Sequence, residues 1–278
     1  MFEKFVLKRV GLLGCGAIGT EIALAIDSGK ISAKLTHVYD FSKENSKKLV
    51  DKLENKPVVT ENVGLLAASP VDLIIEAASQ DAVRDNVLSI LQNRKDVMIM
   101  SAGALLDETI FDIVMDGCKD FNKRVYLPSG AIIGLDGIRA VQDELDSVVL
   151  VTTKNPKALK GAKFFETSPI NLDDIKTVTT IYEGNAQEAV RMFPANINVA
   201  ALLSLAGIGS KKTRVRIVAD PATDKNTHEI QAQGKFGKFS VKVENVPSPS
   251  NLKTSRLATL SAIECLRKIC GTTLNVGA

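Results

Sequence analysis

The chain has 278 residues, of which 45% are hydrophobic and 24% are charged, a composition typical of a soluble enzyme with two domains. The net charge of +3 is too small to indicate nucleic acid as a partner, and no apolar run reaches the roughly 18 residues that span a membrane. The first residues are too few and too charged for a signal peptide, so we expect a cytoplasmic protein.

Four cysteines occur, and their spacing matches no common metal-binding pattern. Cys15, Cys118, Cys265 and Cys270 form no C-x-x-C pair, and none has a histidine at zinc spacing. We therefore predict free thiols in a reducing compartment and no metal site, with Cys15 acting as a small filler.

The first half of the chain alternates short apolar runs with amphipathic segments. Strands are predicted at 9–13, 34–39, 58–60, 72–77, 96–100 and 124–127, and helices at 19–28, 42–53, 80–92 and 108–119. This order predicts an α/β fold with a doubly wound parallel sheet of the Rossmann type, over residues 1–127.

After residue 127 the pattern changes to longer strands. Strands are predicted at 147–153, 177–182, 214–219, 227–233 and 238–246, and helices at 185–192 and 195–206. The last two strands flank Gly234–Gly237, a hairpin turn. We expect a second α+β domain at 128–250 with a mostly antiparallel sheet.

The end of the chain is predicted to return to the first domain. Residues 247–250 (Pro-Ser-Pro-Ser) have the composition of a linker, and 254–269 has helical spacing of apolar residues. We expect the segment 251–278 to pack back onto the first domain.

A glycine-rich loop, residues 14–19, directly follows the first predicted strand and opens the first helix. Its sequence Gly14-Cys15-Gly16-Ala17-Ile18-Gly19 matches G-x-G-x-x-G. Gly14 permits the tight turn, Gly16 lets the backbone approach a pyrophosphate, and Gly19 lets the helix pack on the strand. The context predicts a dinucleotide site that includes Ala17 and Ile18. The alternative is a glycine-rich turn with no ligand.

The second predicted strand ends in Asp40. A carboxylate there would hydrogen-bond the adenosine ribose and repel a 2′-phosphate, which favours NAD over NADP. Lys43 and Lys47 follow, so NADP stays open. The alternative is a surface aspartate.

Small residues follow two central strands of the predicted sheet. Glu76-Ala77-Ala78-Ser79 ends one strand and Ser101-Ala102-Gly103-Ala104 follows the next. Small residues at these carboxyl ends leave room for a ligand, so Ala78 and Ser79 are candidates for the nicotinamide end. Tight strand–helix turns explain them equally well.

Two segments of the second domain are candidates for cofactor contact. Residues 128–137 are small, flexible and poor in charge, as expected of a hinge or of a loop close to a cofactor. Asn196 and Asn198 precede an apolar helix, where either caps the helix or reaches the nicotinamide amide.

Of the two histidines, His37 lies within the second strand and is interpreted as packed or on the surface. By strand parity His228 shares an apolar face with Ile230 and Ala232. It is therefore a core histidine or a residue that faces a cleft, and the residues alone do not decide between these.

The sequence resembles the L-aspartate dehydrogenase family of archaea and bacteria. The matching segments are the glycine loop, 76–79, 101–104, 128–137, 193–200, 226–230, Glu244-Asn245 and 247–249. The resemblance implies that His228 is catalytic, that Ala131 and Asn198 contact NAD, and that the protein is a homodimer.

The implied reaction is oxidative deamination of L-aspartate to iminoaspartate and then to oxaloacetate and ammonia. A histidine titrating near neutrality would move the protons, while the cofactor takes the hydride. Arg139, Lys163 and Lys211 are possible partners of the substrate carboxylates. The product would feed NAD synthesis, or the reverse reaction would aminate oxaloacetate.

Two other interpretations remain open. A related reductase, such as a homoserine dehydrogenase or a dihydrodipicolinate reductase, would share the fold, but no paired-histidine motif precedes a lysine in the second domain. A non-enzymatic NAD(H) sensor would keep the glycine loop, and His228 weighs against it.

Overall fold

The computed structural model describes residues 7–193, 198–248 and 251–271. These residues form two compact units, and each is considered by itself. The first unit runs to Pro128 and takes in the chain again from Ser261, and the second spans Ser129–Leu260. No helix within the described ranges is both long enough and apolar enough to cross a membrane.

The first unit is built on a six-stranded sheet in the order β3-β2-β1-β4-β5-β6, and all its pairs are parallel. The strands are β1 (Lys8–Leu13), β2 (Ala33–Tyr39), β3 (Val58–Val59), β4 (Leu73–Glu76), β5 (Asp96–Ile99) and β6 (Val125–Tyr126). The helices are α1 (Ala17–Asp27), α2 (Lys43–Lys52), α3 (Val63–Ala68), α4 (Gln80–Gln92) and α5 (Glu108–Phe121). The predicted doubly wound parallel sheet is confirmed.

The core of this unit forms because its central strands are apolar on both faces, as parallel strands covered by helices must be. Leu73, Ile74 and Ile75 of β4 are all fully buried. The last helix, α10 (Arg256–Cys270), adds Ala262, Leu266 and Cys270 to the same core.

Helix α3 was not predicted, because it has six residues and its apolar residues follow no helical period. Its start is set by Asn62, whose Oδ1 accepts a hydrogen bond from the Leu65 N–H at 2.8 Å.

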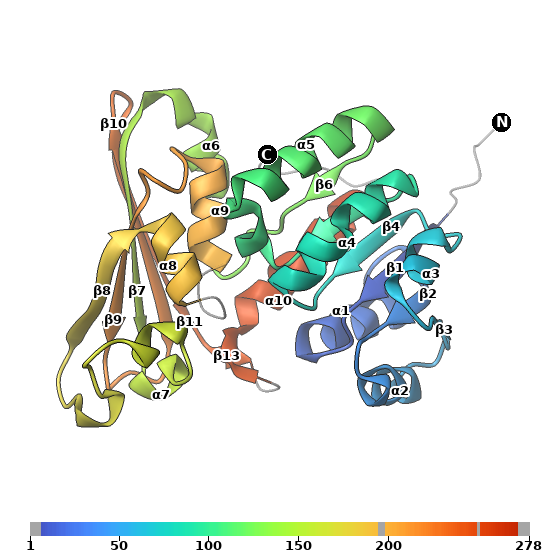
Figure 1. Cartoon of the computed structure of the whole chain (residues 1–278), viewed down its shortest axis with the longest axis horizontal. Coiled ribbons are helices and arrows are strands. Elements are labelled where there is room, and N and C mark those ends of the chain that lie inside the picture. Colours follow the sequence, from blue (N-terminus) through green and yellow to red (C-terminus); the bar gives the residue numbers. More distant parts are fainter. Residues whose placement is uncertain (1–6, 194–197, 249–250, 272–278) are drawn as a thin grey trace. The chain divides into compact units, whose positions relative to one another are not determined.

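The second unit is built on a five-stranded sheet in the order β11-β10-β7-β9-β8. The strands are β7 (Leu145–Lys154), β8 (Thr179–Asn185), β9 (Arg214–Ala219), β10 (Asn226–Gly234) and β11 (Gly237–Asn245). Only β7 and β9 pair in parallel, so the mostly antiparallel sheet is confirmed. The described helices are α6 (Leu135–Ala140), α7 (Pro156–Leu159), α8 (Ala186–Met192) and α9 (Asn198–Ala206), and α8 and α9 lie on one side of the sheet (Figure 1).

Two segments of this unit are more regular than their composition indicated. The segment 128–137, which has the composition of a flexible loop, ends in the first residues of a helix. Gly134 adopts φ 83°, and α6 begins at Leu135. The expected linker at 247–250 instead starts with strand β12 (Pro247–Ser248), which pairs with β13 (Asn251–Ser255). Proline is tolerated at the first residue of a short edge strand, so a segment with the composition of a linker still pairs here. The start of the predicted helix 195–206 lies outside the described residues.

Candidate functional site

The glycine loop closes tightly against the carboxyl end of β4. Gly14 has φ +100°, and a Cβ there would lie 2.6 Å from the carbonyl atoms of Ala77. A Cβ at Gly19 would collide with the carbonyl oxygen of Gly14. Both positions therefore require glycine for the fold itself, whether or not a ligand is bound.

Gly16 differs from these two glycines, because it is exposed and a Cβ there would meet no protein atom within 4 Å. It precedes α1, whose first N–H groups donate to no capping side chain, because the N-cap residue is Gly16 itself. Side chains do cap α2, α3, α4 and α5. Bare backbone at an uncapped helix N-terminus fits the pyrophosphate of a dinucleotide.

Asp40 lies directly beside the glycine loop, at the end of β2. Its carboxylate accepts hydrogen bonds from the Cys15 N–H at 2.7 Å, the Ser42 N–H at 2.8 Å and the Asn45 amide at 3.2 Å. A carboxylate has about four acceptor positions, so these bonds fix it while leaving capacity for one more donor. Burial raises the pKa of the adjacent Cys15 thiol to about 12, so this cysteine is a filler without nucleophilic character.

Glu76, at the end of β4, has a role that sequence analysis missed. It is 1% exposed and accepts hydrogen bonds from the N–H groups of Ala78, Met100 and Ser101 and from the Ser101 hydroxyl. Burial raises the pKa of this carboxyl. The side chain ties the carboxyl ends of β4 and β5 together.

The candidates Ala78 and Ser79 are both exposed at this edge. The Ser79 hydroxyl accepts a hydrogen bond from the Ala82 N–H at 3.1 Å, so it caps α4. The structure therefore brings Gly14, Gly16, Gly19 and Asp40 together, and it gives Ser79 a structural task as well.

In the second unit, the inward face of the sheet is apolar at one end of β7 and β10 and polar at the other end. At one end the facing pairs are Val148 with Ala232 and Leu150 with Ile230. At the other end polar side chains take the same inward positions. We call Thr152, Lys154, Asn226, His228 and Asn245 the polar cluster, and each is at most 4% exposed.

His228 lies within this cluster, opposite Thr152, and its Nδ1 hydrogen-bonds with the Thr152 hydroxyl at 3.0 Å. Burial and the nearby positive charge of Lys154 lower the pKa of His228 to about 3. At neutral pH the His228 ring is therefore neutral in this structure, whereas the sequence led us to expect a histidine that titrates near neutrality. Burial lowers the pKa of Lys154 to about 8, so this lysine titrates closer to neutral pH than His228 does.

The other candidates of the second unit lie in two places. Ala131 is 6% exposed, and its carbonyl accepts a hydrogen bond from the Asn245 amide of the polar cluster at 3.0 Å. Asn198 is half-buried at the first residue of α9. Asn196 lies outside the described residues.

Sequence analysis missed Thr152, Lys154 and Asn226, and it proposed more exposed cations in their place. Arg139, Lys163 and Lys211 are all exposed. The missed signal was strand parity: Lys154 lies two residues from Thr152 and four from Leu150, in positions that all face inward. A lysine on such a face is unusual enough to be a candidate.

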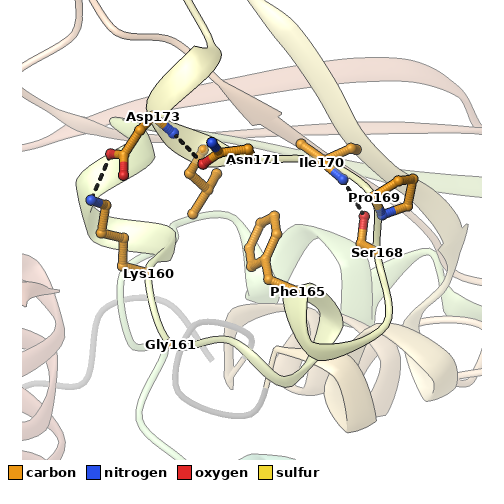
Figure 2. A pocket seen from close by; sticks show the side chains of 9 residues that line it. Lys160, Gly161, Phe165, Ser168, Pro169, Ile170, Asn171 and Asp173 are labelled. Atoms are coloured by element: carbon orange, nitrogen blue, oxygen red, sulfur yellow. Dashed lines mark hydrogen bonds and ion pairs between the residues drawn. The ribbon is translucent and has the colours of Figure 1, made fainter.

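A separate pocket on the second unit involves none of the predicted residues (Figure 2). Its Lys160 forms an ion pair with Asp173 at 2.6 Å, and Asn171 accepts a hydrogen bond from the Asp173 N–H. Its two charged side chains, Lys160 and Asp173, are thus paired with each other at the surface.

Comparison with known proteins separates the two halves of the chain. Residues 14–128 match the family model described as the NAD-binding domain of homoserine dehydrogenase. Residues 136–269 match the model described as the C-terminal domain of aspartate dehydrogenase. The likeness to homoserine dehydrogenase is therefore confined to the nucleotide-binding half.

Relatives match over nearly the whole chain. The L-aspartate dehydrogenase of Nitrosopumilus maritimus is 62% identical over 98% of this chain and 100% of its own length. That of Methanococcoides burtonii is 48% identical over 94% and 96%. The crystal structure of aspartate dehydrogenase from Thermotoga maritima superposes with a TM-score of 0.77 at 29% identity, covering 98% of this chain and 100% of that one. The chain belongs to the L-aspartate dehydrogenase family.

Proposed function

We propose that this protein is an oxidoreductase that oxidises L-aspartate with NAD(P), forming iminoaspartate and then oxaloacetate and ammonia. The observation that carries the proposal is the buried polar cluster around His228, in a chain that matches L-aspartate dehydrogenases from end to end. The inward face of this sheet is apolar at one end and polar at the other. Buried polar groups are costly without partners, so we expect a ligand at the polar end.

The cofactor belongs to the first unit, which serves as the dinucleotide-binding domain. Gly14, Gly16, Ala17, Ile18 and Gly19 would hold the pyrophosphate, Asp40 the ribose, and Ala78 and Ser79 would line the nicotinamide end. The open space at Gly16 and the uncapped start of α1 support this assignment. When bound, the nicotinamide accepts the hydride from the substrate Cα. The resemblance to the family assigns NAD contacts to Ala131 and Asn198 as well.

The three hydrogen bonds that Asp40 accepts support a preference for NAD. The carboxylate is fixed by three donors of its own chain, so it would not swing away from a 2′-phosphate. Its negative charge would repel that group, whereas a ribose hydroxyl would donate to the remaining acceptor position.

His228 is the proposed catalytic residue. With Nδ1 engaged by Thr152, we assign Nε2 to the substrate, where the neutral ring accepts a proton from the water that adds to the C=N bond. A substrate with two carboxylates would raise the pKa of this ring, which opposes the effect of burial. The ring would then return the proton to the departing ammonia.

The second unit is proposed as the substrate, catalytic and dimerisation domain of a cytoplasmic homodimer. Support comes from its other sheet face, where Val149, Val151 and Glu229 are half-buried and Gln231 is exposed. All four cysteines are free, as in a reducing compartment. The product would feed NAD synthesis.

The deciding experiment measures NADH formation at mildly alkaline pH with L-aspartate, L-homoserine and L-glutamate in separate assays. Turnover with L-aspartate alone is expected. Turnover with L-homoserine alone would support the related reductase instead. Tight NADH binding without turnover of any of the three would support a sensor and overturn the proposal.

A further inference from the structure

Glu76 is a buried carboxyl group that the proposed reaction does not use. It is 1% exposed at the end of β4, paired with Leu13, the last residue before the glycine loop. Its Oε1 accepts hydrogen bonds from the Ala78 N–H at 2.7 Å and the Ser101 hydroxyl at 2.9 Å. Its Oε2 accepts from the N–H groups of Met100 at 3.2 Å and Ser101 at 3.0 Å. The four donors come from the residues just past β4 and just past β5, so one side chain fixes both stretches of backbone.

The order of the strands indicates which half of a dinucleotide lies at this edge. β1 lies between β2 and β4, and β4 lies between β1 and β5. Asp40 at the end of β2 is assigned to the adenosine ribose, and the glycine loop after β1 is assigned to the pyrophosphate. The ligand crosses the carboxyl ends of the strands, so the remaining half continues past β4 towards β5. The nicotinamide half is therefore expected at Ala78 and Ser79, which are exposed there.

Ala78 is exposed, yet its N–H donates to a side chain that is almost fully buried. A buried acceptor that is itself held by other donors restricts the backbone at Ala78 before any ligand arrives, so less freedom is lost on binding. We propose that Glu76 is a positioning residue, which holds the backbone at Ala78 in the arrangement that receives the nicotinamide half of the cofactor. The inference rests on the proposed function and adds to it a residue that acts through Ala78.

The variant Glu76→Gln tests this role with a side chain of the same size. The amide keeps one acceptor oxygen, which we expect at the Oε2 position because two N–H groups donate there. Its NH2 group then faces the Ala78 N–H, donor against donor, whereas the Ser101 hydroxyl can rotate and accept. Ala78 thus loses its acceptor, while the ends of β4 and β5 stay joined.

Calorimetry with NADH and with ADP-ribose separates a positioning role from a general loss of stability, because ADP-ribose lacks the nicotinamide. We expect Glu76→Gln to bind NADH at least about fivefold more weakly, since the disturbed backbone lies at the nicotinamide half. ADP-ribose affinity should stay within about twofold, because Asp40 and the glycine loop are unchanged. Ile75→Val is the matched control: it removes a buried methyl group from the same strand and should leave both affinities unchanged.

Amide hydrogen exchange at Ala78 tests the same role in the unmodified protein, so the answer does not depend on the folding of a variant. A backbone already held by Glu76 should exchange at least about 100-fold more slowly than an unstructured amide without NADH, and NADH should add little. An Ala78 amide that exchanges freely until NADH is added would overturn the proposal.

An equal loss of NADH and ADP-ribose affinity in folded Glu76→Gln would also overturn it, and so would no loss of either. Failure of the proposed function is seen in the unmodified protein, which would then neither bind NADH nor oxidise L-aspartate, and that result would overturn both.

Discussion

At the glycine loop Asp40 and Glu76 accept hydrogen bonds from their own chain, whereas in the polar cluster the Asn226 amide nitrogen has no hydrogen-bond partner among the described residues. Asp40 accepts three hydrogen bonds from protein donors, and Glu76 accepts four. What the loop leaves open is backbone at Gly16. In the polar cluster, Asn226 keeps an unused donor and Lys154 is a buried cation.

The difference indicates two ways of preparing for a ligand. The first region offers shape and backbone dipoles, which cost little when the site is empty. The second holds desolvated side chains in place, which costs stability until a ligand arrives. Variants should therefore affect activity and stability together or separately, depending on the region.

The largest expected effect is that of His228→Ala. Loss of a general acid and base typically costs 10²–10⁴-fold, and we expect kcat to fall by about 1,000-fold. NADH affinity, measured by fluorescence titration, should stay within about twofold because the glycine loop is untouched. His37→Ala is the control, since His37 lies on β2 of the first unit and its Nδ1 hydrogen-bonds with the neighbouring Thr36 hydroxyl at 3.0 Å. A fully active His228→Ala variant would remove His228 from the mechanism.

Next in size is a gain of stability in Lys154→Met. Burial lowers the pKa of Lys154 from 10.5 to about 8, so the charged form costs about 3 kcal/mol below pH 8. Between pH 8 and 10.5 the unfolded chain binds more protons than the folded one, so this cost disappears as the pH rises. The variant should be more stable than the original at pH 7, and the difference should shrink towards pH 10.5. Urea unfolding at several pH values measures it, and a less stable variant at pH 7 would contradict this view of the polar cluster.

Two glycine variants separate fold from ligand in the first region. Gly14→Ala forces a Cβ against the Ala77 carbonyl at φ +100°, so we expect a loss of at least about 2 kcal/mol of unfolding free energy. Gly16→Ala meets no protein atom, so its stability should change by less than about 0.5 kcal/mol while its NADH affinity falls. If Gly16→Ala binds NADH normally, the pyrophosphate does not approach the loop at Gly16.

The two regions also differ in how far the sequence predicted them. The glycine loop is a local motif, because its turn, its strand and its helix are neighbours in the chain, and only the structural role of Glu76 escaped notice. The polar cluster joins β7 to β10 across 76 residues between Thr152 and His228. Parity placed His228 on an inward face, but only the strand register shows which residues lie opposite it. The pKa of His228 was misjudged for the same reason, since neither its burial nor the proximity of Lys154 is visible in a single sequence.

The smallest expected effect concerns the choice between NAD and NADP. Asp40→Asn keeps the size of the side chain and removes its charge, so a 2′-phosphate would no longer be repelled. We expect the ratio of kcat/KM for NAD over NADP to fall by about tenfold, which corresponds to about 1.4 kcal/mol. The amide loses acceptor capacity for the N–H groups of Cys15 and Ser42, so a modest fall in stability should accompany the change.

Asp51→Asn on the exposed side of α2 is the control. An unchanged ratio would mean that Asp40 holds the glycine loop without reading the ribose, and the first region would then contribute geometry alone.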